Sequence, residues 1–298
     1  CLTATLSFMK WGSLNVLITN PRDLPELVKE LGRWPWTIMT GVNTLFNGLL
    51  NTTGFDRLDF SSLKAVIGGG AAVQKSVAER WQRVTGCNIT EGYGLTEASP
   101  VACANPIGTP WNGTIGIPYP STELTIRDAV FAELPPWTGA GDIEKFTGEI
   151  CVRGPQVMKG YWNSPAETAK VMQDGWLRTG DIGHMDGNGW FTITDRKKDM
   201  ILVSGFNVYP NEVESVVATL PGVLECGVVG VPDAKTGEAV KVVVVRKDPG
   251  LTAETVIAHC KAHLTGYKVP RHVEFRDAMP KTPIGKILRR ELRDAPKA

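Results

Sequence analysis

The chain has 298 residues, of which 42% are hydrophobic and 21% charged, and its formal net charge is +1. This size and composition can bury one large or several smaller cores, which excludes a disulfide-stapled miniprotein and a disordered segment. The near-zero charge excludes the basic excess of a dedicated nucleic-acid-binding protein, so we expect no nucleic-acid partner. Six cysteines occur without a C-x-x-C pair, which favours a reducing cytoplasm over a zinc or redox site.

The apolar segments are all shorter than the roughly 20 residues that span a bilayer. We therefore expect any membrane contact to be peripheral, at the inner face of the cytoplasmic membrane. The first residues lack an initiator Met and a basic region, so they do not resemble a signal peptide. They indicate a chain that is cut within a domain.

Residues 1–112 alternate strand-like and helical patterns, which is typical of α/β layers. A glycine triplet at residues 68–70 follows one predicted strand and precedes a helix, where backbone amides can face an anion. It completes neither G-x-G-x-x-G nor a Walker P-loop. The predicted elements of this part are strands at 14–18 and 65–67, and helices at 24–31, 42–50 and around Val77, Trp81 and Val84.

Residues 113–198 change to short alternating segments separated by Gly, Pro and Asp-Gly turns, which predicts a β-rich subdomain. A charged stretch, residues 195–199, ends this part, and a self-contained mixed pattern occupies residues 199–298. The predicted elements are strands at 123–127, 149–153, 190–194, 226–231, 240–246 and 272–275, and helices at 211–220, 253–264 and from Ile287.

The segment from Glu91 to Glu97 places two glycines around Tyr93, followed by a hydroxyl and a carboxylate. Glycine permits close backbone approach, the ring offers a stacking face, and Thr96 with Glu97 can hold a phosphate and its Mg²⁺. An alternative interpretation is a glycine-flanked strand end with a buried Tyr. Local chemistry leaves both interpretations open.

Two charged motifs follow. Thr179-Gly-Asp181 is predicted to lie in a turn between β segments, where Asp181 can accept hydrogen bonds from ribose hydroxyls, or where it simply stabilises the turn. Arg196, Lys197 and Lys198 can pair with phosphates, or can form a solvated charge cluster.

A Pro/Gly loop from Pro280 to Lys286 precedes a basic stretch near the end of the chain. Its lysine can bring a mobile cation to a carboxylate or phosphate, and the alternative is a solvated surface loop. His259 and His263 stand one helical turn apart, but without the Glu of H-E-x-x-H and without a third ligand in view we do not expect a metal site there.

Together these motifs, in this order, resemble those of the adenylate-forming superfamily of acyl-CoA synthetases, luciferases and peptide-synthetase adenylation domains. The matching segments are Gly92-Tyr-Gly-Leu-Thr-Glu97, Gly175-Trp-Leu-Arg-Thr-Gly-Asp181, Asp195-Arg-Lys-Lys-Asp199, residues 205–212 and Gly285-Lys286. Within the superfamily the chain is similar to the bacterial long-chain fatty acid CoA ligases. One departure is Arg178, where their signature usually has His.

The resemblance implies an α/β fold with three parts. Residues 1–112 would be the end of a large AMP-binding domain, residues 113–198 a β-rich subdomain ending at a hinge, and residues 199–298 a small mobile α+β C-terminal domain. The Ser/Thr/Gly-rich phosphate loop of the family does not occur in this sequence. We therefore expect a C-terminal half that is inactive alone.

The resemblance also implies roles for single residues. Gly69 and Gly70 would border the adenine and acyl pocket, Tyr93 would stack on adenine beside Gly94, and Asp181 would bind the ribose. The residues implied at the reacting groups, the hinge and the pantetheine path are Thr96 (phosphate), Glu97 (Mg²⁺), Arg196 (ribose or phosphate), Lys198 (hinge), Gly205 (pantetheine path) and Lys286 (carboxylate and α-phosphate).

The implied reaction uses ATP, Mg²⁺, CoA and a fatty acid. The carboxylate attacks the α-phosphate to give acyl-AMP, and CoA then displaces AMP after the small domain rotates about Lys198. Two alternatives stay open at this point: adenylation of an amino acid or another carboxylate, and a non-catalytic remnant that binds a nucleotide or CoA. The sequence also leaves a homodimer open.

Overall fold

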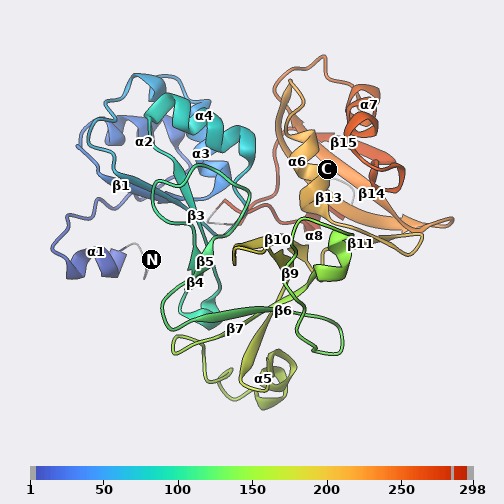
Figure 1. Ribbon diagram of the computed structural model, residues 1–298. Helices are drawn as coiled ribbons and strands as arrows, with labels where there is room; N and C mark the ends of the chain where they lie inside the picture. Colours follow the sequence, from blue (N-terminus) through green and yellow to red (C-terminus); the bar gives the residue numbers. More distant parts are fainter. Residues whose placement is uncertain (1–4, 283–284, 294–298) are drawn as a thin grey trace. The chain divides into compact units, whose positions relative to one another are not determined.

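The computed structural model describes residues 5–282 and 285–293 (Figure 1). It divides the chain into two compact units. Unit 1 comprises Cys1–Thr179 with Gly183–Ile193, and unit 2 comprises Gly180–Ile182 with Thr194–Ala298. The finer division at residues 112 and 198 stays a prediction from the sequence.

The first sheet of unit 1 has the strand order β1-β2-β3-β4-β5. Its first three strands are parallel, and β4 and β5 add to β3 in antiparallel fashion. The helices α2, α3 and α4 accompany the parallel strands (Figure 1). The element bounds are β1 (Ile38–Gly41), β2 (Ala65–Gly68), β3 (Ile89–Gly94), β4 (Val101–Ala104), β5 (Ile117–Pro118), α2 (Leu24–Leu31), α3 (Asn43–Leu50) and α4 (Lys75–Thr85).

Aromatic packing forms the core between these helices and the sheet. Trp81 of α4 lies edge-on to Phe46 of α3, with ring centroids 4.9 Å apart, and both side chains are fully buried. Local signals fix the helix ends: Asp23 caps α2 by accepting from the Glu26 N–H at 3.1 Å, and α4 ends at Gly86, whose φ is 73°.

The predicted strand at residues 14–18 is wrong. These residues lie outside the strands, and Leu14 and Leu17 are 77% and 76% exposed. An apolar run forms a strand only where a neighbouring strand supplies hydrogen bonds, and this run has no such partner among the described residues. A short helix, α1 (Ser7–Lys10), precedes it.

The second sheet has the order β10-β9-β7-β6, with β8 paired to β9. Its buried face carries alternate residues such as Leu124, Ile126, Ile150 and Val152. The predicted turn at Thr179-Gly-Asp181 is wrong, because the segment lies inside β9 and Gly180 adopts its φ of 72° within the strand. The bounds are β6 (Glu123–Arg127), β7 (Gly148–Arg153), α5 (Pro165–Val171), β8 (Met172–Gln173), β9 (Trp176–Met185) and β10 (Phe191–Arg196).

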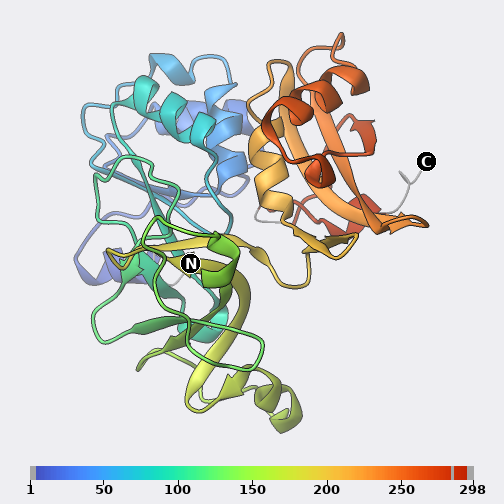
Figure 2. The ribbon, with the colours of Figure 1, turned by 45° about the vertical axis from the view of Figure 1, so that its right-hand side comes forward.

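Unit 2 is built on a sheet with the order β12-β11-β14-β13, to which β15 adds in parallel beside β14. Figure 2 shows this sheet with helices against it. The bounds are β11 (Ile201–Val203), β12 (Phe206–Val208), α6 (Pro210–Val217), β13 (Val223–Asp233), β14 (Gly237–Arg246), α7 (Ala253–His263), β15 (His272–Arg276) and α8 (Arg290–Arg293).

Strand alternation gives the sheet of unit 2 two apolar faces. Val228, Val242 and Val244 join the core made with α6 and α7, whereas Val229 and Val243 join a smaller cluster with Leu292 of α8. The basic helix predicted from Ile287 begins only at Arg290, because Leu288 donates its N–H to the Pro280 carbonyl at 2.9 Å instead.

The sequence prediction of a mixed α/β fold is confirmed, as are a β-rich part and a C-terminal α+β part. Short 3₁₀ helices complete the chain: η2 (Phe55–Arg57), η3 (Thr96–Ala98), η4 (Ile143–Phe146) and η5 (Gly266–Lys268). Across residues 5–282 and 285–293, no helix combines the length and the apolar character that a bilayer span requires.

Candidate functional site

The glycine triplet lies at the carboxyl end of β2, beside the parallel strand β3. Gly70 has a φ of 77°, which favours glycine, and a Cβ on Gly69 would meet the Gly92 carbonyl at 3.2 Å. The carboxyl ends of parallel strands are the usual ligand-binding edge of an α/β sheet. The structure therefore puts Gly69 and Gly70 at a suitable edge, next to the segment that carries Tyr93.

Tyr93 and Gly94 form the last residues of β3. The Tyr93 side chain is 8% exposed and packs with residues of β4, β6 and β7. Gly94 needs glycine for close approach rather than for its φ, because a Cβ there would lie 1.8 Å from the Pro100 carbonyl oxygen. This burial matches the alternative of a buried Tyr at a glycine-flanked strand end, while stacking on adenine stays a prediction.

Thr96 and Glu97 lie in η3, directly after β3, with Thr96 exposed and Glu97 half-buried. The Tyr161 hydroxyl donates to Glu97 Oε1 at 2.8 Å, and the Met158 N–H donates to the Glu97 carbonyl at 2.8 Å. Tyr161 was missed from the sequence, since 64 residues separate it from Glu97. The Tyr161 contact orients the carboxylate of Glu97, and the Met158 contact holds its backbone.

Glu91 lies within β3, two residues before Tyr93, and its side chain is buried. Its side chain accepts the Val73 N–H at 2.9 Å and the residue is 8% exposed. Burial raises the pKa of Glu91 to about 7, and the hydrogen bond from Val73 acts in the opposite direction. The carboxyl group thereby connects β3 to the loop that leads into α4.

In unit 2, three of the predicted residues lie close together. Arg196 Nε is 3.0 Å from Asp181 Oδ1, and Asp181 is 4% exposed. Burial and then the charge of Arg196 lower the pKa of Lys286 below the ordinary lysine value, whereas Asp181 acts in the opposite direction. The structure thus brings one carboxylate and two cations into one electrostatic group.

Lys286 lies on a hairpin whose two arms, residues 281–282 and 285–287, are paired, while residues 283–284 of the predicted loop lie outside the described residues. Its N–H donates to Thr282 Oγ1 at 3.1 Å, and its carbonyl accepts the Thr282 N–H at 2.8 Å. Lys281 and Ile287 form a β-bridge across the hairpin, and Lys281 Nζ is 2.6 Å from Glu225. This geometry gives the lysine a defined backbone position.

The other two predicted residues of unit 2 occupy exposed turns. Lys198 lies in the turn after β10. Gly205 lies between β11 and β12 with a φ of 85°, and no atom would lie within 4 Å of an added Cβ. Both positions are accessible, and their roles as hinge and pantetheine contact stay predictions.

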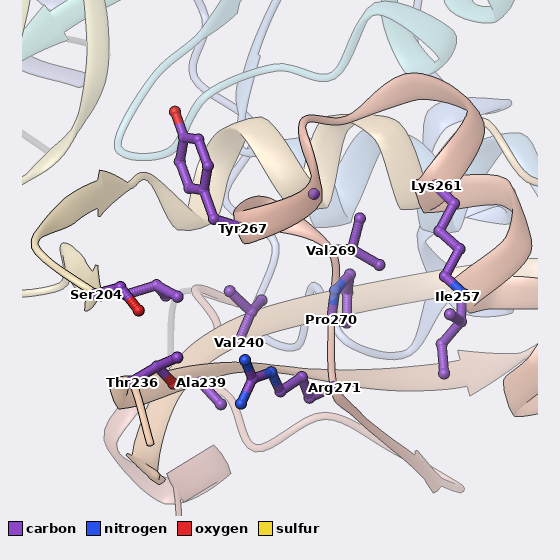
Figure 3. A pocket seen from close by; sticks show the side chains of 12 residues that line it. Ser204, Thr236, Ala239, Val240, Ile257, Lys261, Tyr267, Val269, Pro270 and Arg271 are labelled. Atoms are coloured by element: carbon purple, nitrogen blue, oxygen red, sulfur yellow. The ribbon is translucent and has the colours of Figure 1, made fainter. Parts of the chain in front are cut away.

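A pocket of about 470 Å³ opens beside the Gly205 turn, between β11, β14 and η5 (Figure 3). Its floor is apolar, and Lys261 and Arg271 bring two cationic side chains to it. Arg271 Nη1 also pairs with Asp233 Oδ2 at 3.0 Å. No single motif in the sequence marks this pocket, because its lining residues come from segments more than 60 residues apart.

No group of three or more His, Cys, Asp or Glu side chains within the described part of the chain is arranged to hold a metal ion. His263 Nδ1 instead contacts the His259 carbonyl at 2.8 Å. Glu97 can therefore offer a single carboxylate to a cation. This donor set suits Mg²⁺, which commonly binds through one or two carboxylates together with substrate phosphates and water.

Comparison with known proteins gives consistent matches along the chain. A family model described as AMP-binding enzyme matches residues 1–162, and one described as AMP-binding enzyme C-terminal domain matches residues 212–286. A long-chain-fatty-acid–CoA ligase of Escherichia coli O6:H1 is 56% identical over 97% of this chain and 50% of its own length. A ligase of the same name from Bacillus subtilis is 43% identical over 98% of this chain and 51% of its own length.

A solved structure of similar fold is the ATP-bound protein MatB from Rhodopseudomonas palustris. It has a TM-score of 0.80 and 34% identity, and the match covers 91% of this chain and 52% of that one. The chain therefore spans about half the length of the curated relatives it matches.

Proposed function

Because the chain belongs to the family of AMP-binding enzymes, we propose that it is part of a ligase that activates a long-chain fatty acid and transfers it to CoA. The proposed reaction joins the carboxylate and ATP into acyl-AMP with release of pyrophosphate, and the CoA thiol then displaces AMP. The observation that carries this proposal is the group formed by Asp181, Arg196 and Lys286, together with the identity to ligases of this name.

The first step must bring two anions together, since a carboxylate attacks a phosphate. We propose that the cationic side chain of Lys286 offsets this repulsion and stabilises the charge of the transition state. The paired backbone around Lys286 gives this cation a fixed point of attachment. Arg196 would contact the ribose or a phosphate, and Asp181 would accept hydrogen bonds from the ribose hydroxyls. Each assignment agrees with the donor and acceptor groups that these side chains present.

The residues at the end of β3 are proposed to serve the same nucleotide. Gly69, Gly70, Tyr93 and Gly94 would border the adenine, and Thr96 would donate to a phosphate. Glu97, oriented by Tyr161, would hold Mg²⁺. The metal would supply Lewis-acid polarisation of the phosphate oxygens.

For the second step we assign the pocket beside the Gly205 turn to CoA. Its cationic side chains suit the CoA phosphates, and its apolar floor suits the less polar parts of the molecule (Figure 3). Between the two steps, the C-terminal part would rotate at Lys198. This rotation would withdraw the hairpin of Lys286 from the acyl-AMP and bring the Gly205 turn to it.

We propose the cytoplasm as the location of the enzyme. The cysteines of the described part are free thiols, which supports a reducing compartment: Cys87, Cys103, Cys151, Cys226 and Cys260. Peripheral contact with the inner face of the cytoplasmic membrane and formation of a homodimer stay predictions.

The test is the Lys286→Ala change in a protein of the relatives' full length that contains this chain. We expect acid-dependent exchange between ATP and pyrophosphate to fall by roughly 10² to 10³, while thioester formation from supplied acyl-AMP is retained. Lys235→Ala, at an exposed turn of the same unit, is the matched control and should leave both half-reactions unchanged.

A series of acids separates the remaining alternatives. Exchange with fatty acids of long chain supports the proposal, and exchange with amino acids alone would instead support an amino-acid adenylation domain. A folded full-length protein without exchange for any acid would leave only the non-catalytic remnant.

A further inference from the structure

Arg289 lies three residues after Lys286 and binds a cluster of acidic and amide side chains. Its Nη1 is 3.0 Å from Asp195 Oδ1 and 3.5 Å from Asp199 Oδ2. Its Nη2 is 2.9 Å from Glu214 Oε2, and its Nε donates to Glu214 Oε1 at 3.2 Å. Nη2 also donates to the Asn211 side-chain oxygen. We call these five residues the Arg289 anchor.

The anchor is largely withdrawn from solvent. Asp195 is fully buried, and the side chains of Arg289 and Glu214 are 18% and 16% exposed. Burial raises the pKa of both Asp195 and Glu214, and the charge of Arg289 opposes that rise. A buried carboxylate without a partner costs free energy, so the loss of Arg289 would leave Asp195 and Glu214 unfavourably charged. This cost favours the position in which Arg289 binds both carboxylates.

The carboxylates of the anchor are themselves fixed to the backbone. Asp195 accepts the N–H of Arg196 at 2.7 Å through Oδ1 and the N–H of Asn211 at 2.8 Å through Oδ2. Glu214 Oε1 accepts the Val228 N–H at 2.8 Å. The anchor therefore ties the segment before α8 to the end of β10, to α6 and to β13.

Two residues of the proposed site are close to this anchor along the chain. Arg196, which pairs with Asp181, is the residue after Asp195. Lys286 reaches Arg289 through a short segment in which Leu288 donates to the Pro280 carbonyl at 2.9 Å. A displacement of Arg289 would consequently move the base of the Lys286 hairpin relative to Arg196.

We propose that Arg289 is a positioning residue, which sets Lys286 against Arg196 and Asp181 by binding Asp195 and Glu214 at the same time. The planar fork of arginine can reach two carboxylates in fixed directions, whereas a lysine offers one point charge on a flexible stem. The side chain of Lys286 is long and flexible, so the position of its ammonium group depends on where its backbone is held. A misplacement of a reacting group by about 1 Å can lower a rate by roughly 10²-fold. This role rests on the proposed function only in assigning Lys286 to the reaction.

The first test uses Arg289→Lys, which keeps the charge but loses the fork. In the full-length protein we expect kcat of pyrophosphate exchange to fall by roughly 10- to 100-fold, with KM for ATP and acid changed less than about threefold. Thioester formation from supplied acyl-AMP should stay within a few-fold of the original. Arg290→Lys is the matched control, because the Arg290 side chain is 80% exposed, and it should change neither step.

A second variant, Glu214→Gln, changes a carboxylate that binds Arg289 instead of Arg289 itself. The glutamine keeps the volume and an acceptor for the Val228 N–H but loses the charge, so the fold should be retained. We expect the same selective loss of kcat. The double variant with Arg289→Lys should lose little more than either single variant, because both act through one contact.

A chemical readout on the 298-residue chain does not depend on activity. Acetylation by a water-soluble ester, followed by peptide mass spectrometry, gives the rate at which Lys286 and the exposed Lys235 are modified. We expect the two rates to differ in the original chain and to converge in Arg289→Lys and Glu214→Gln. Unchanged Lys286 rates in both folded variants would overturn the positioning role, even if the ligase function holds. A full-length protein without exchange would overturn the function, while the acetylation rates would still decide the positioning role.

Discussion

A buried carboxyl group gives the residue Glu91 a measurable effect on stability. Its pKa is about 7 in the folded chain, against about 4.3 for an unfolded glutamate, so folding retains a proton between these pH values. The free energy of unfolding should then fall as pH rises from about 4.3 to about 7, by up to about 4 kcal/mol, and stay level above. Glu91→Gln keeps an acceptor for the Val73 N–H and should remove this fall.

Urea unfolding at pH 5 and pH 7.5 measures most of this fall in the free energy of unfolding. All nine tryptophans lie in unit 1, so their fluorescence reports on the unit that contains Glu91. Glu79→Gln is the control, because the Glu79 side chain is 51% exposed. Parallel pH profiles for the original chain and Glu91→Gln would contradict the argument.

Single residues of the candidate site were predictable where chemistry is local. The motif around Tyr93 and the charged motifs at Asp181 and Lys286 stand out because a few neighbouring residues carry the signal. Contacts such as Tyr161 with Glu97, or Arg289 with Asp195, join positions 64 and 94 residues apart. Only the fold brings these partners together, so no spacing in the sequence could indicate them.

The strand β3 contains two glycines with different structural demands. A Cβ on Gly94 would lie 1.8 Å from the Pro100 carbonyl oxygen, so the backbone must move, whereas a Cβ on Gly92 would meet Ala104 Cβ at an ordinary 3.6 Å. We expect Gly94→Ala to lower the free energy of unfolding by several kcal/mol, on the order of 3, and Gly92→Ala to change it by less than about 1 kcal/mol.

Tryptophan fluorescence in urea is again the measurement, and Gly92→Ala is the matched control on the same strand. Equal stability of the two variants would show that the strand end relaxes and that close approach does not explain the second glycine. If a stable Gly92→Ala variant bound nucleotide more weakly, the change in affinity would reflect the nucleotide site and not a loss of stability.

Elements were predictable from the sequence where periodicity and packing agree. Trp81 and Val77 lie on the buried side of α4, and alternate valines form the two faces of β13 and β14. The errors arose where a local signal competes with pairing. Gly180 looks like a turn yet lies within β9, and residues 14–18 are apolar yet find no strand to join.

At the scale of the whole molecule, unit 2 holds an apolar core of its own. The core cluster formed by β11, β13, β14, α6 and α7 comes from residues 201–260, and the Arg289 anchor adds ion pairs to Asp195 and Glu214 within the same unit. Lys197 and Lys198, in contrast, are exposed in the turn that follows β10. We therefore expect limited trypsin digestion to cut first at this turn.

The expected product begins near Asp199 and resists further cleavage, because its core needs no residue from unit 1. It contains no tryptophan, so it can be recognised by mass and by the absence of indole fluorescence, and its far-UV circular dichroism should melt cooperatively. Lys197→Gln with Lys198→Gln should slow the first cut without changing the melting of the uncut chain. If trypsin instead cuts first within β13 or β14, or if the product melts without a transition, residues 199–298 depend for their fold on the rest of the chain, including Asp195 of the Arg289 anchor.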